Sequence, residues 1–351
     1  MVDRRVVGHR GELAPGPRLS RCCNMKFSSG HWYAVLSSRE LRNRPFGATR
    51  FGERLVFWRD SAGKAVCFDD RCPHRGAALS QGRLHDGTLA CPYHGFRYDS
   101  SGRCVEVPAE GTWHIPEHFC AKTRHVQERH DFVWLWRGPE TATEELPPVP
   151  QFPVPNGTIF GECIQHWPTH YTRCIEGVID HSHLPFVHRK SLGIFIRNPL
   201  TPIRVEPFDG GFRSNMLRDD RVMHHVDFVY PNVWIQNLSD RWTMSATFAP
   251  IDDTTTAVYN RWHHKIRAPL LRSFVNLWGR FSVFMVFHED MAILATQQPA
   301  NTDDAAADKL VPSDAAQMEF RKMRAQYQKE FDGVAGQIVP QDGPRSASKA
   351  G

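Results

Sequence analysis

The feature that most constrains this chain is a pair of matched segments, each with a cysteine and a histidine beside proline and glycine. Residues 72–76 read Cys-Pro-His-Arg-Gly and residues 91–95 read Cys-Pro-Tyr-His-Gly, with 16 residues (75–90) between the first histidine and the second cysteine. Proline and glycine favour tight turns, so each segment is expected to present one thiolate and one imidazole to a metal. The four candidate ligands are Cys72, His74, Cys91 and His94.

Two kinds of metal site use two cysteines and two histidines. In a Rieske [2Fe–2S] centre, one iron takes two thiolates and the other takes two imidazoles. Two loops that each give one ligand to each iron satisfy that division. A structural zinc site usually has a cysteine pair followed by a histidine pair, whereas cysteine and histidine alternate here. The order therefore favours the Rieske centre over zinc.

A second candidate metal site lies at residues 176–188, which hold three histidines and two acids in 13 residues. His183 and His188 are five apart, a spacing that a continuous helix would place about 140° apart around its axis. Pro185 can interrupt the helix, so that both imidazoles can meet one metal. Two imidazoles and one carboxylate on one face leave other positions open, as in non-haem Fe(II) oxygenases. The candidate carboxylate is Asp290, and its rival is Glu289.

The two sets together resemble the catalytic (alpha) subunits of Rieske non-haem iron aromatic-ring-hydroxylating oxygenases, over about residues 31–330. The spacing Asp180-x2-His183-x4-His188, followed by a distant Glu-Asp pair, carries the second half of this resemblance. Residues 296–300 and 311–314 also resemble the single-component branch related to saxitoxin-pathway hydroxylases. Respiratory Rieske proteins add a cysteine to each loop, where this chain has Ala77 and Tyr93, so no disulfide is expected.

The resemblance implies an α+β chain, with an N-terminal all-β Rieske domain and an α+β helix-grip (START-like) catalytic domain built on an antiparallel sheet. The expected divisions are a basic irregular arm at 1–30, a Rieske domain at 31–140, a catalytic domain at 141–335 and a disordered tail at 336–351. Residue patterns predict strands near 54–58, 65–68, 131–136, 228–236 and 242–248, a turn at 252–254, and helices near 171–184, 270–298 and 315–332.

The resemblance also implies residue roles. His183, His188 and Asp290 match the ligands of the mononuclear Fe(II), and Asp180 matches a carboxylate that bridges the two metal centres. In the family, the cluster of one subunit serves the iron of a neighbour. A homotrimer is therefore implied, in which His94 of one subunit meets Asp180 and His183 of the next. Gly177 stands where relatives often have asparagine, which leaves Glu176, water or a more open pocket at that place.

The implied reaction uses O2 and electrons from a separate NAD(P)H-dependent reductase, directly or through a ferredoxin. It hydroxylates or oxidatively demethylates a small organic substrate, and ring cis-dihydroxylation is the alternative. A ferredoxin-like electron carrier and a zinc-binding regulatory protein are the competing classes. The carrier would lack the second ligand set. No Gly-x-Gly-x-x-Gly motif follows a predicted strand, so the chain is not expected to bind the dinucleotide itself.

Charge and cysteine content bear on partners and location. Residues 1–50 carry ten Lys/Arg against three acids, which fits a solvated tail, a surface for an acidic redox partner or a targeting segment. The basic residues show no aromatic interleaving, so nucleic acid is not an expected partner. No apolar run reaches the length of about 20 residues that spans a bilayer. Nine cysteines, an odd number without a signal peptide, favour the cytoplasm.

Overall fold

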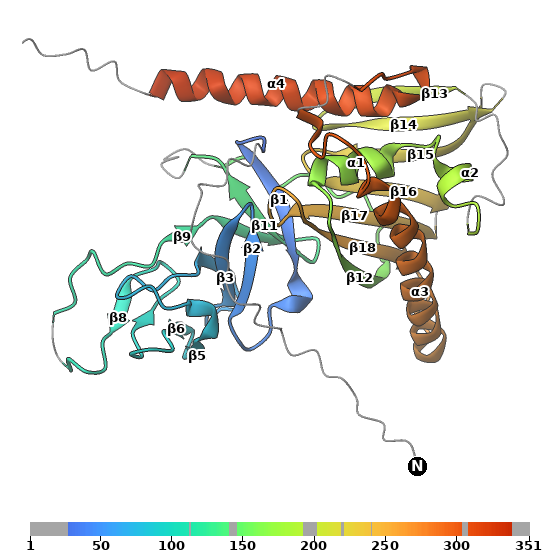
Figure 1. Cartoon of the computed structure of the whole chain (residues 1–351). Helices are drawn as coiled ribbons and strands as arrows, with labels where there is room; N and C mark the ends of the chain where they lie inside the picture. Colours follow the sequence, from blue (N-terminus) through green and yellow to red (C-terminus); the bar gives the residue numbers. More distant parts are fainter. Residues whose placement is uncertain are drawn as a thin grey trace, which may run out of the picture.

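The computed structural model describes residues 27–111, 114–139, 146–191, 202–218, 221–239, 241–303 and 308–338. Within these residues the strands form four antiparallel sheets, and the long helices all belong to the C-terminal half (Figure 1). The fold is thus mixed α+β. Most of the basic arm and the end of the tail lie outside the described residues.

The N-terminal half is built from three small sheets. Aromatic and β-branched residues dominate the buried strands, as in Phe132–Arg137, because such side chains pack well on a pleated surface. The strands expected near 54–58, 65–68 and 131–136 are present. The sheets are β1(His31–Ser37)-β11(Phe132–Arg137)-β10(Val126–Arg129), β2(Phe46–Arg50)-β3(Glu53–Arg59)-β4(Ala65–Asp69)-β9(Thr123–Arg124) and β5(Arg83–His85)-β6(Thr88–Ala90)-β7(Arg97–Tyr98)-β8(Cys104–Glu106). Short 3-10 helices lie at Ser38–Glu40 and Leu79–Gln81.

The C-terminal half is built on one seven-stranded sheet with the order β12-β18-β17-β16-β15-β14-β13. Its strands are β12(Ile159–Trp167), β13(Ile203–Phe208), β14(Gly211–Arg218), β15(Arg221–Val229), β16(Val233–Ser239), β17(Trp242–Pro250) and β18(Thr256–His264). Neighbouring strands from β13 to β18 follow each other in sequence. Only β12 returns from the start of this half to close against the last strand, β18.

The helices lie on this sheet, as Figure 1 shows. They are α1(Tyr171–Ile179), α2(Leu184–Val187), α3(Pro269–Leu294) and α4(Ala315–Ile338), with a 3-10 turn at Pro312–Asp314 before α4. Helix α1 packs on β16 and β17 and touches both α3 and α4. Helix α3 packs on β12 at one end of the sheet, and α4 packs on β13 at the other. The long helices thereby enclose α1 and the segment that follows it.

Two expected elements differ from the structure. The run 228–236 is not one strand but the hairpin between β15 and β16, with its turn at Tyr230–Asn232. Pro231 has no N–H to donate to a sheet ladder, which explains why the apolar pattern breaks there. The helix expected over 171–184 ends at Ile179, and Leu184–Val187 forms a separate short helix.

The two halves share a buried core. One cluster joins residues of β1 and β11 to residues of β15–β18. The side chain of Asn232 donates to the Ala34 carbonyl (2.9 Å) and accepts from the Ala34 N–H (3.3 Å). Val149 and Phe152, just past the expected domain division at residue 140, are buried in the same cluster. The small sheets are therefore fastened to the large one, while the division expected at residue 140 stays a prediction.

Helix α3 carries apolar side chains on its exposed side as well as on its buried side. Its buried residues recur three or four positions apart and face the sheet: Gly279, Val283, Phe287, Asp290 and Leu294. Large apolar side chains are also exposed on the opposite face. Among the described residues, α3 alone is long and apolar enough to cross a membrane by length and composition, where the sequence pattern had indicated no such segment. A helix packed against a sheet passes the same test, so length and composition do not decide its role.

Candidate metal centres

The matched cysteine–histidine segments form two loops with the same backbone hydrogen bonds. The N–H groups of Cys72 and Cys91 each donate to the carbonyl five residues later, at 2.8 Å in both loops. The N–H groups of Gly76 and Gly95 donate back to the cysteine carbonyls at 2.8 and 3.0 Å. These glycines have φ values of +74° and +75°, a region that favours glycine. The repeated motif therefore forms the same turn in both loops.

The donor groups of the two loops separate into a thiol pair and an imidazole pair. Cys72 and Cys91 are both buried, and burial together with the adjacent Cys72 thiol raises the pKa of the Cys91 thiol. The rings of His74 and His94 lie 4.7 Å apart between centroids and are more exposed than the cysteines. This separation matches a diiron unit whose irons take different ligand types.

One nitrogen in this centre lacks the partner that a buried polar atom requires. The Nδ1 atom of His74 is buried, and no hydrogen-bond partner for it lies within the described part of the chain. Buried polar atoms are nearly always satisfied, and an iron ligated by this nitrogen would satisfy it. The thiols, the imidazoles and this free nitrogen therefore fit a [2Fe–2S] cluster.

Neighbouring aromatic side chains hold the ligands in place. The Phe96 ring stacks on His74 with an interplanar angle of 3°, and Tyr93 stacks on His94. The Tyr98 hydroxyl lies 3.2 Å from Cys72 Sγ. A hydrogen bond to a ligand sulfur stabilises the reduced cluster, which carries more negative charge, and so raises its reduction potential.

Tyr98→Phe should therefore lower the cluster's reduction potential by about 40 mV, the equivalent of one hydrogen bond worth about 1 kcal/mol. Potentiometric titration of the reduced cluster's EPR signal measures this shift. Tyr93→Phe is the matched control, because the Tyr93 ring is largely exposed and stacks on a histidine rather than contacting a sulfur. An equal shift in both variants would contradict a specific role for the Tyr98 hydroxyl.

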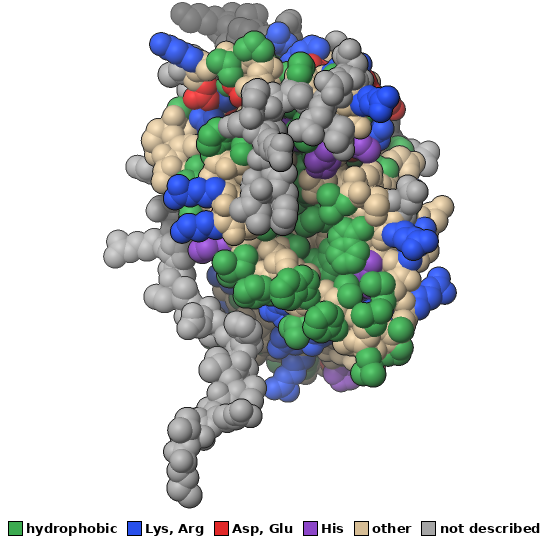
Figure 2. Space-filling model, turned by 90° about the vertical axis from the view of Figure 1, so that its right-hand side faces the viewer, with side chains coloured by type: hydrophobic (Ala, Val, Ile, Leu, Met, Phe, Trp, Pro, Cys, Tyr) green, Lys and Arg blue, Asp and Glu red, His purple; other side chains and the backbone are tan. Residues whose placement is uncertain are grey.

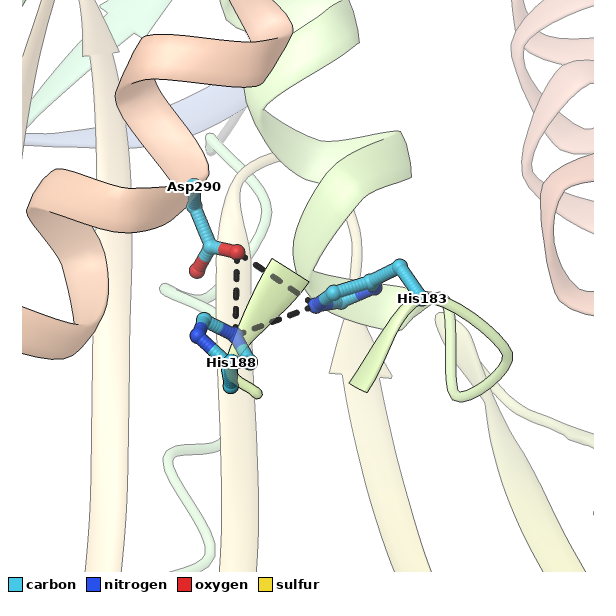
Figure 3. A group of neighbouring side chains, drawn as sticks. All are labelled: His183, His188 and Asp290. Carbon is cyan, nitrogen blue, oxygen red and sulfur yellow. Dashed lines mark hydrogen bonds and ion pairs between the residues drawn. The ribbon is translucent and has the colours of Figure 1, made fainter. Parts of the chain in front are cut away.

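The second predicted ligand set converges on one point from α2 and α3 (Figure 3). The Nε2 atoms of His183 and His188 are 3.3 Å apart. Asp290 Oδ1 lies 3.3 Å from the first and 3.1 Å from the second. In the part of the chain that the structure describes, this is the one group of three such donors within 4.8 Å of one another.

His183 Nε2, His188 Nε2 and Asp290 Oδ1 form a triangle, and its sides have the length that a first-row metal needs. Bonds of about 2.1 Å set at right angles to one another place neighbouring donors about 3.0 Å apart. The three measured separations of 3.1–3.3 Å are close to that value. Three donors at this spacing would occupy one face of the ion and leave its other positions to small molecules. The residues fit a mononuclear Fe(II) with an open face.

The local backbone explains how two histidines five residues apart meet. Helix α1 ends at Ile179, and the Asp180 carboxylate accepts hydrogen bonds from the Ser182 N–H (2.7 Å) and hydroxyl (2.6 Å). His183 then precedes the single turn of α2 and His188 follows it. Pro185 lies in the first turn of α2, where proline is tolerated. The helix is thus broken at Asp180, not at Pro185 as the sequence had suggested.

The outer nitrogens of both histidines face carboxylates. His183 Nδ1 lies 3.4 Å from Asp180 Oδ2, and His188 Nδ1 lies 2.9 Å from Glu289 Oε2. The Ser191 hydroxyl donates to the same Glu289 oxygen at 2.7 Å. Glu289 therefore faces away from the triangle, on the far side of the His188 ring. Sequence reasoning had treated it only as the rival of Asp290. The sequence offered one signal for this role, namely that Glu289 directly precedes the candidate ligand Asp290.

The electrostatics favour a cation at the centre. Burial alone would lower the pKa of His183, but hydrogen bonds with Asp180 and Asp290 outweigh it and raise that pKa to about 9. Burial would raise the pKa of Asp290, yet hydrogen bonds from His183 and His188 hold it below its ordinary value. The pKa of Asp180 is also lowered, by its contacts with His183 and Ser182 against the effect of burial. Charged carboxylates around two imidazoles attract a divalent ion.

A cavity of about 390 Å³ opens beside the triangle, between α1, α3 and the start of α4. Asp180, His183 and Asp290 lie in its wall, together with Ile293 and Gln297. The wall is mixed in character, with charged side chains next to apolar ones. Small molecules therefore have a route to the triangle, and so does the surface of another protein.

Gly177 and Glu176 do not add a ligand to the triangle. Glu176 accepts hydrogen bonds from Arg321 (2.6 Å) and Arg173 (3.1 Å), and this buried ion-pair cluster occupies its carboxylate. A Cβ atom at Gly177 would lie 2.6 Å from a methyl carbon of Leu294. The place where relatives often carry asparagine is thus closely packed by Leu294 of α3.

Substituting the two neighbouring acids should separate their roles. We expect Asp290→Ala to lose the mononuclear iron and to keep the visible absorbance of the cluster, because only Asp290 reaches both Nε2 atoms. Glu289→Gln should keep that iron with affinity reduced roughly tenfold to a hundredfold, the usual effect of losing a carboxylate behind a ligating histidine. Iron and acid-labile sulfide analysis of the purified proteins checks both.

The matched control is Glu206→Gln, an exposed acid on β13, which should leave the metal content unchanged. Full iron content in Asp290→Ala would exclude Asp290 as a ligand. Loss of iron in Glu289→Gln but not in Asp290→Ala would make Glu289 the ligand and exclude Asp290.

Comparison with known proteins bears on both centres. Residues 31–125 match the model of the Rieske [2Fe-2S] domain. Over 318 residues, the chain is 26% identical to Protein TIC 55, chloroplastic, of Arabidopsis thaliana, covering 83% of this chain and 58% of that protein. It is 32% identical over 168 residues to the vanillate O-demethylase oxygenase subunit of a Pseudomonas species, covering 48% of this chain and 47% of the relative.

Among solved structures, the crystal structure of dicamba monooxygenase bound to dicamba is similar with a TM-score of 0.74 and 19% identity, covering 88% of this chain and all of the other. At this identity the similarity concerns the fold, including the large sheet and its helices. The chain spans about half the length of the curated relatives it matches.

Proposed function

We propose that this chain, which carries a Rieske domain and has Rieske non-haem iron oxygenases as homologues and structural neighbours, is the terminal component of such an oxygenase. It would use O2 and electrons from a separate reductase or ferredoxin. Its reaction would be hydroxylation or oxidative demethylation of a small organic substrate at a mononuclear Fe(II).

The observation that carries this proposal is the triangle of His183, His188 and Asp290 in a chain that also holds the two cysteine–histidine loops. An electron carrier needs only the loops. A zinc-binding regulatory protein needs no open-faced site beside a cavity. A chain that pairs a one-electron donor with an open iron site is equipped for stepwise reduction of O2 at that iron.

The chain's own residues would position the iron and its surroundings. When bound, the cluster supplies single electrons and the mononuclear iron supplies the oxygen chemistry. Asp180 and Glu289 lie against the outer nitrogens of His183 and His188. By accepting from the N–H groups there, they would direct both Nε2 lone pairs to the ion. Asp290 supplies the negative charge that balances the ion. The cavity beside these residues would hold the substrate next to the ion.

Electron delivery is proposed to occur between subunits. In Figure 1 the small sheet β5–β8, which the cysteine loops flank, and helix α2 lie at opposite ends of the molecule. Asp180 lies in the wall of the open cavity, where another subunit could reach it. A head-to-tail homotrimer would bring His94 of one subunit to Asp180 and His183 of the next, a heterologous contact that closes a ring.

The reductase is proposed to dock near the cluster loops. Arg71 and Arg75 are exposed next to the loop of Cys72 and His74. Exposed cations of this kind would steer an acidic electron donor towards the cluster. The role of the basic residues before residue 27 falls outside the described residues. A cytoplasmic location stays a prediction.

Monooxygenation is preferred over ring dihydroxylation because names among the relatives and structural neighbours specify an O-demethylase and a monooxygenase. The test is a substrate screen with a generic reductase, NADH and O2. Products should gain one oxygen atom or lose a methyl carbon. Products that gain two oxygens and two hydrogens would establish the alternative, and electron uptake without any product would leave the chain a carrier.

Asp180→Asn should bind both metals but slow reoxidation of the reduced cluster by at least about tenfold, because the carboxylate that orients His183 and links the centres is lost. Stopped-flow absorbance of the pre-reduced protein mixed with substrate and O2 measures this rate, and EPR confirms metal content. Asp252→Asn, in the exposed turn before β18, is the control. A normal rate in Asp180→Asn would refute the bridging role.

A further inference from the structure

One face of α3 exposes a continuous row of large apolar side chains. Phe274, Trp278 and Phe281 are 65%, 63% and 60% exposed. They lie three or four residues apart and therefore on one side of the helix. Further exposed apolar residues extend the row along the helix: Leu270, Leu271, Leu277, Phe284 and Met285. We call these eight side chains the α3 face.

The α3 face is opposite the side that packs on the sheet. Gly279, Val283 and Phe287 are buried. Val283 comes two residues after Phe281, which at about 100° per residue places it about 200° around the helix axis, on the opposite side. A helix that is apolar all round is normally buried, in a protein core or in a membrane. Exposed apolar patches of this extent mark interaction sites.

Charges around the α3 face are of one sign. Lys265, Arg267, Arg272 and Arg280 are all exposed, and the sequence from 265 to 288 contains no acid. Figure 2 shows the apolar patch on this side of the molecule with Lys and Arg at its borders, while acidic side chains lie only towards the top of the view. A partner that covers the face must therefore offer apolar groups together with negative charge.

We propose that the α3 face binds the surface of an anionic lipid bilayer. Aromatic and leucine side chains would enter the boundary between headgroups and acyl chains, and the cations at the borders of the face would meet the anionic headgroups. Trp278 suits this boundary because its ring is apolar and its N–H is polar. Face-to-face pairing of two copies through this surface fits less well, since it would bring like charges together.

The helix would lie along the bilayer surface rather than cross it. Its other side carries Val283, Phe287 and Leu294 into the core of the large sheet. The same side carries Asp290 to the histidines. Crossing a membrane would expose that core and dismantle the ligand triangle. Only the α3 face is free to meet lipid, which is the geometry of a monotopic contact.

Binding to a bilayer would also favour lipophilic substrates. This part of the inference rests on the proposed function. Met285, at the C-terminal end of the α3 face, precedes Asp290 by about 7.5 Å along the helix axis. Ile293, which is exposed and lies in the wall of the cavity, continues the apolar surface past Asp290. A lipophilic substrate dissolved in the bilayer would then lie close to the iron site.

The test is co-sedimentation of the intact protein with vesicles of phosphatidylcholine alone or mixed with phosphatidylglycerol. Binding to the anionic vesicles should exceed binding to the neutral ones and weaken with added salt. The double variant Trp278→Glu/Phe281→Glu should lose at least about tenfold in partitioning, and Arg280→Ser should lose about fivefold. Leu238→Glu, an exposed apolar position at the end of β16, should bind as the unchanged protein does.

The assay needs no turnover, so it succeeds or fails independently of the oxygenase reaction, and circular dichroism checks that each variant is folded. Equal binding by the α3 variants and the unchanged protein would overturn the proposal. So would a protein that ignores vesicles but forms oligomers that the same α3 variants dissociate, because the face would then join two copies of the chain. In active protein, vesicle binding without turnover of lipophilic compounds would overturn the substrate step alone.

Discussion

The position of α3 on the large sheet determines whether an iron site exists in this chain. The helix reaches the sheet across the indole of Trp262, which lies between Gly161 of β12 and Gly279 of α3. A Cβ atom at Gly161 would lie 2.2 Å from the indole, and one at Gly279 would lie 2.5 Å from it. Only glycine leaves room on both sides of the ring. This packing sets the depth and rotation of α3, and with them the direction in which Asp290 points.

A second close approach fixes α1 against the same helix. Leu294 packs over Gly177, where any larger residue would push the two helices apart or displace Leu294. Because Asp180 and His183 follow directly from the end of α1, the spacing between these helices is also the spacing between histidine and carboxylate ligands. The site is thus held by packing that lies outside it, and the outer carboxylates then orient the rings.

The two metal centres differ in how far they depend on tertiary structure. Each cysteine loop is a local turn, closed by its own backbone hydrogen bonds and a glycine with positive φ. The four candidate donors of the two loops could be identified from residue types and spacing because the second loop repeats the motif of the first. The mononuclear site joins α2 to a residue of α3 that is 102 positions beyond His188 (188 to 290), and no local pattern specifies such a contact. The resemblance to a family supplied Asp290, and the structure supplied the geometry.

By itself, the sequence determined the cluster loops, the alternation of short strands in the first half, the existence of the long helices and the identity of the candidate ligands. Local turn chemistry and apolar periodicity carry that information. Only the tertiary structure decided that the run at 228–236 is a hairpin, that Glu289 supports His188 while Asp290 faces both histidines, and that α3 keeps an apolar face without a partner. Those outcomes depend on which side of a helix meets the sheet, which is set by packing between residues far apart in the chain.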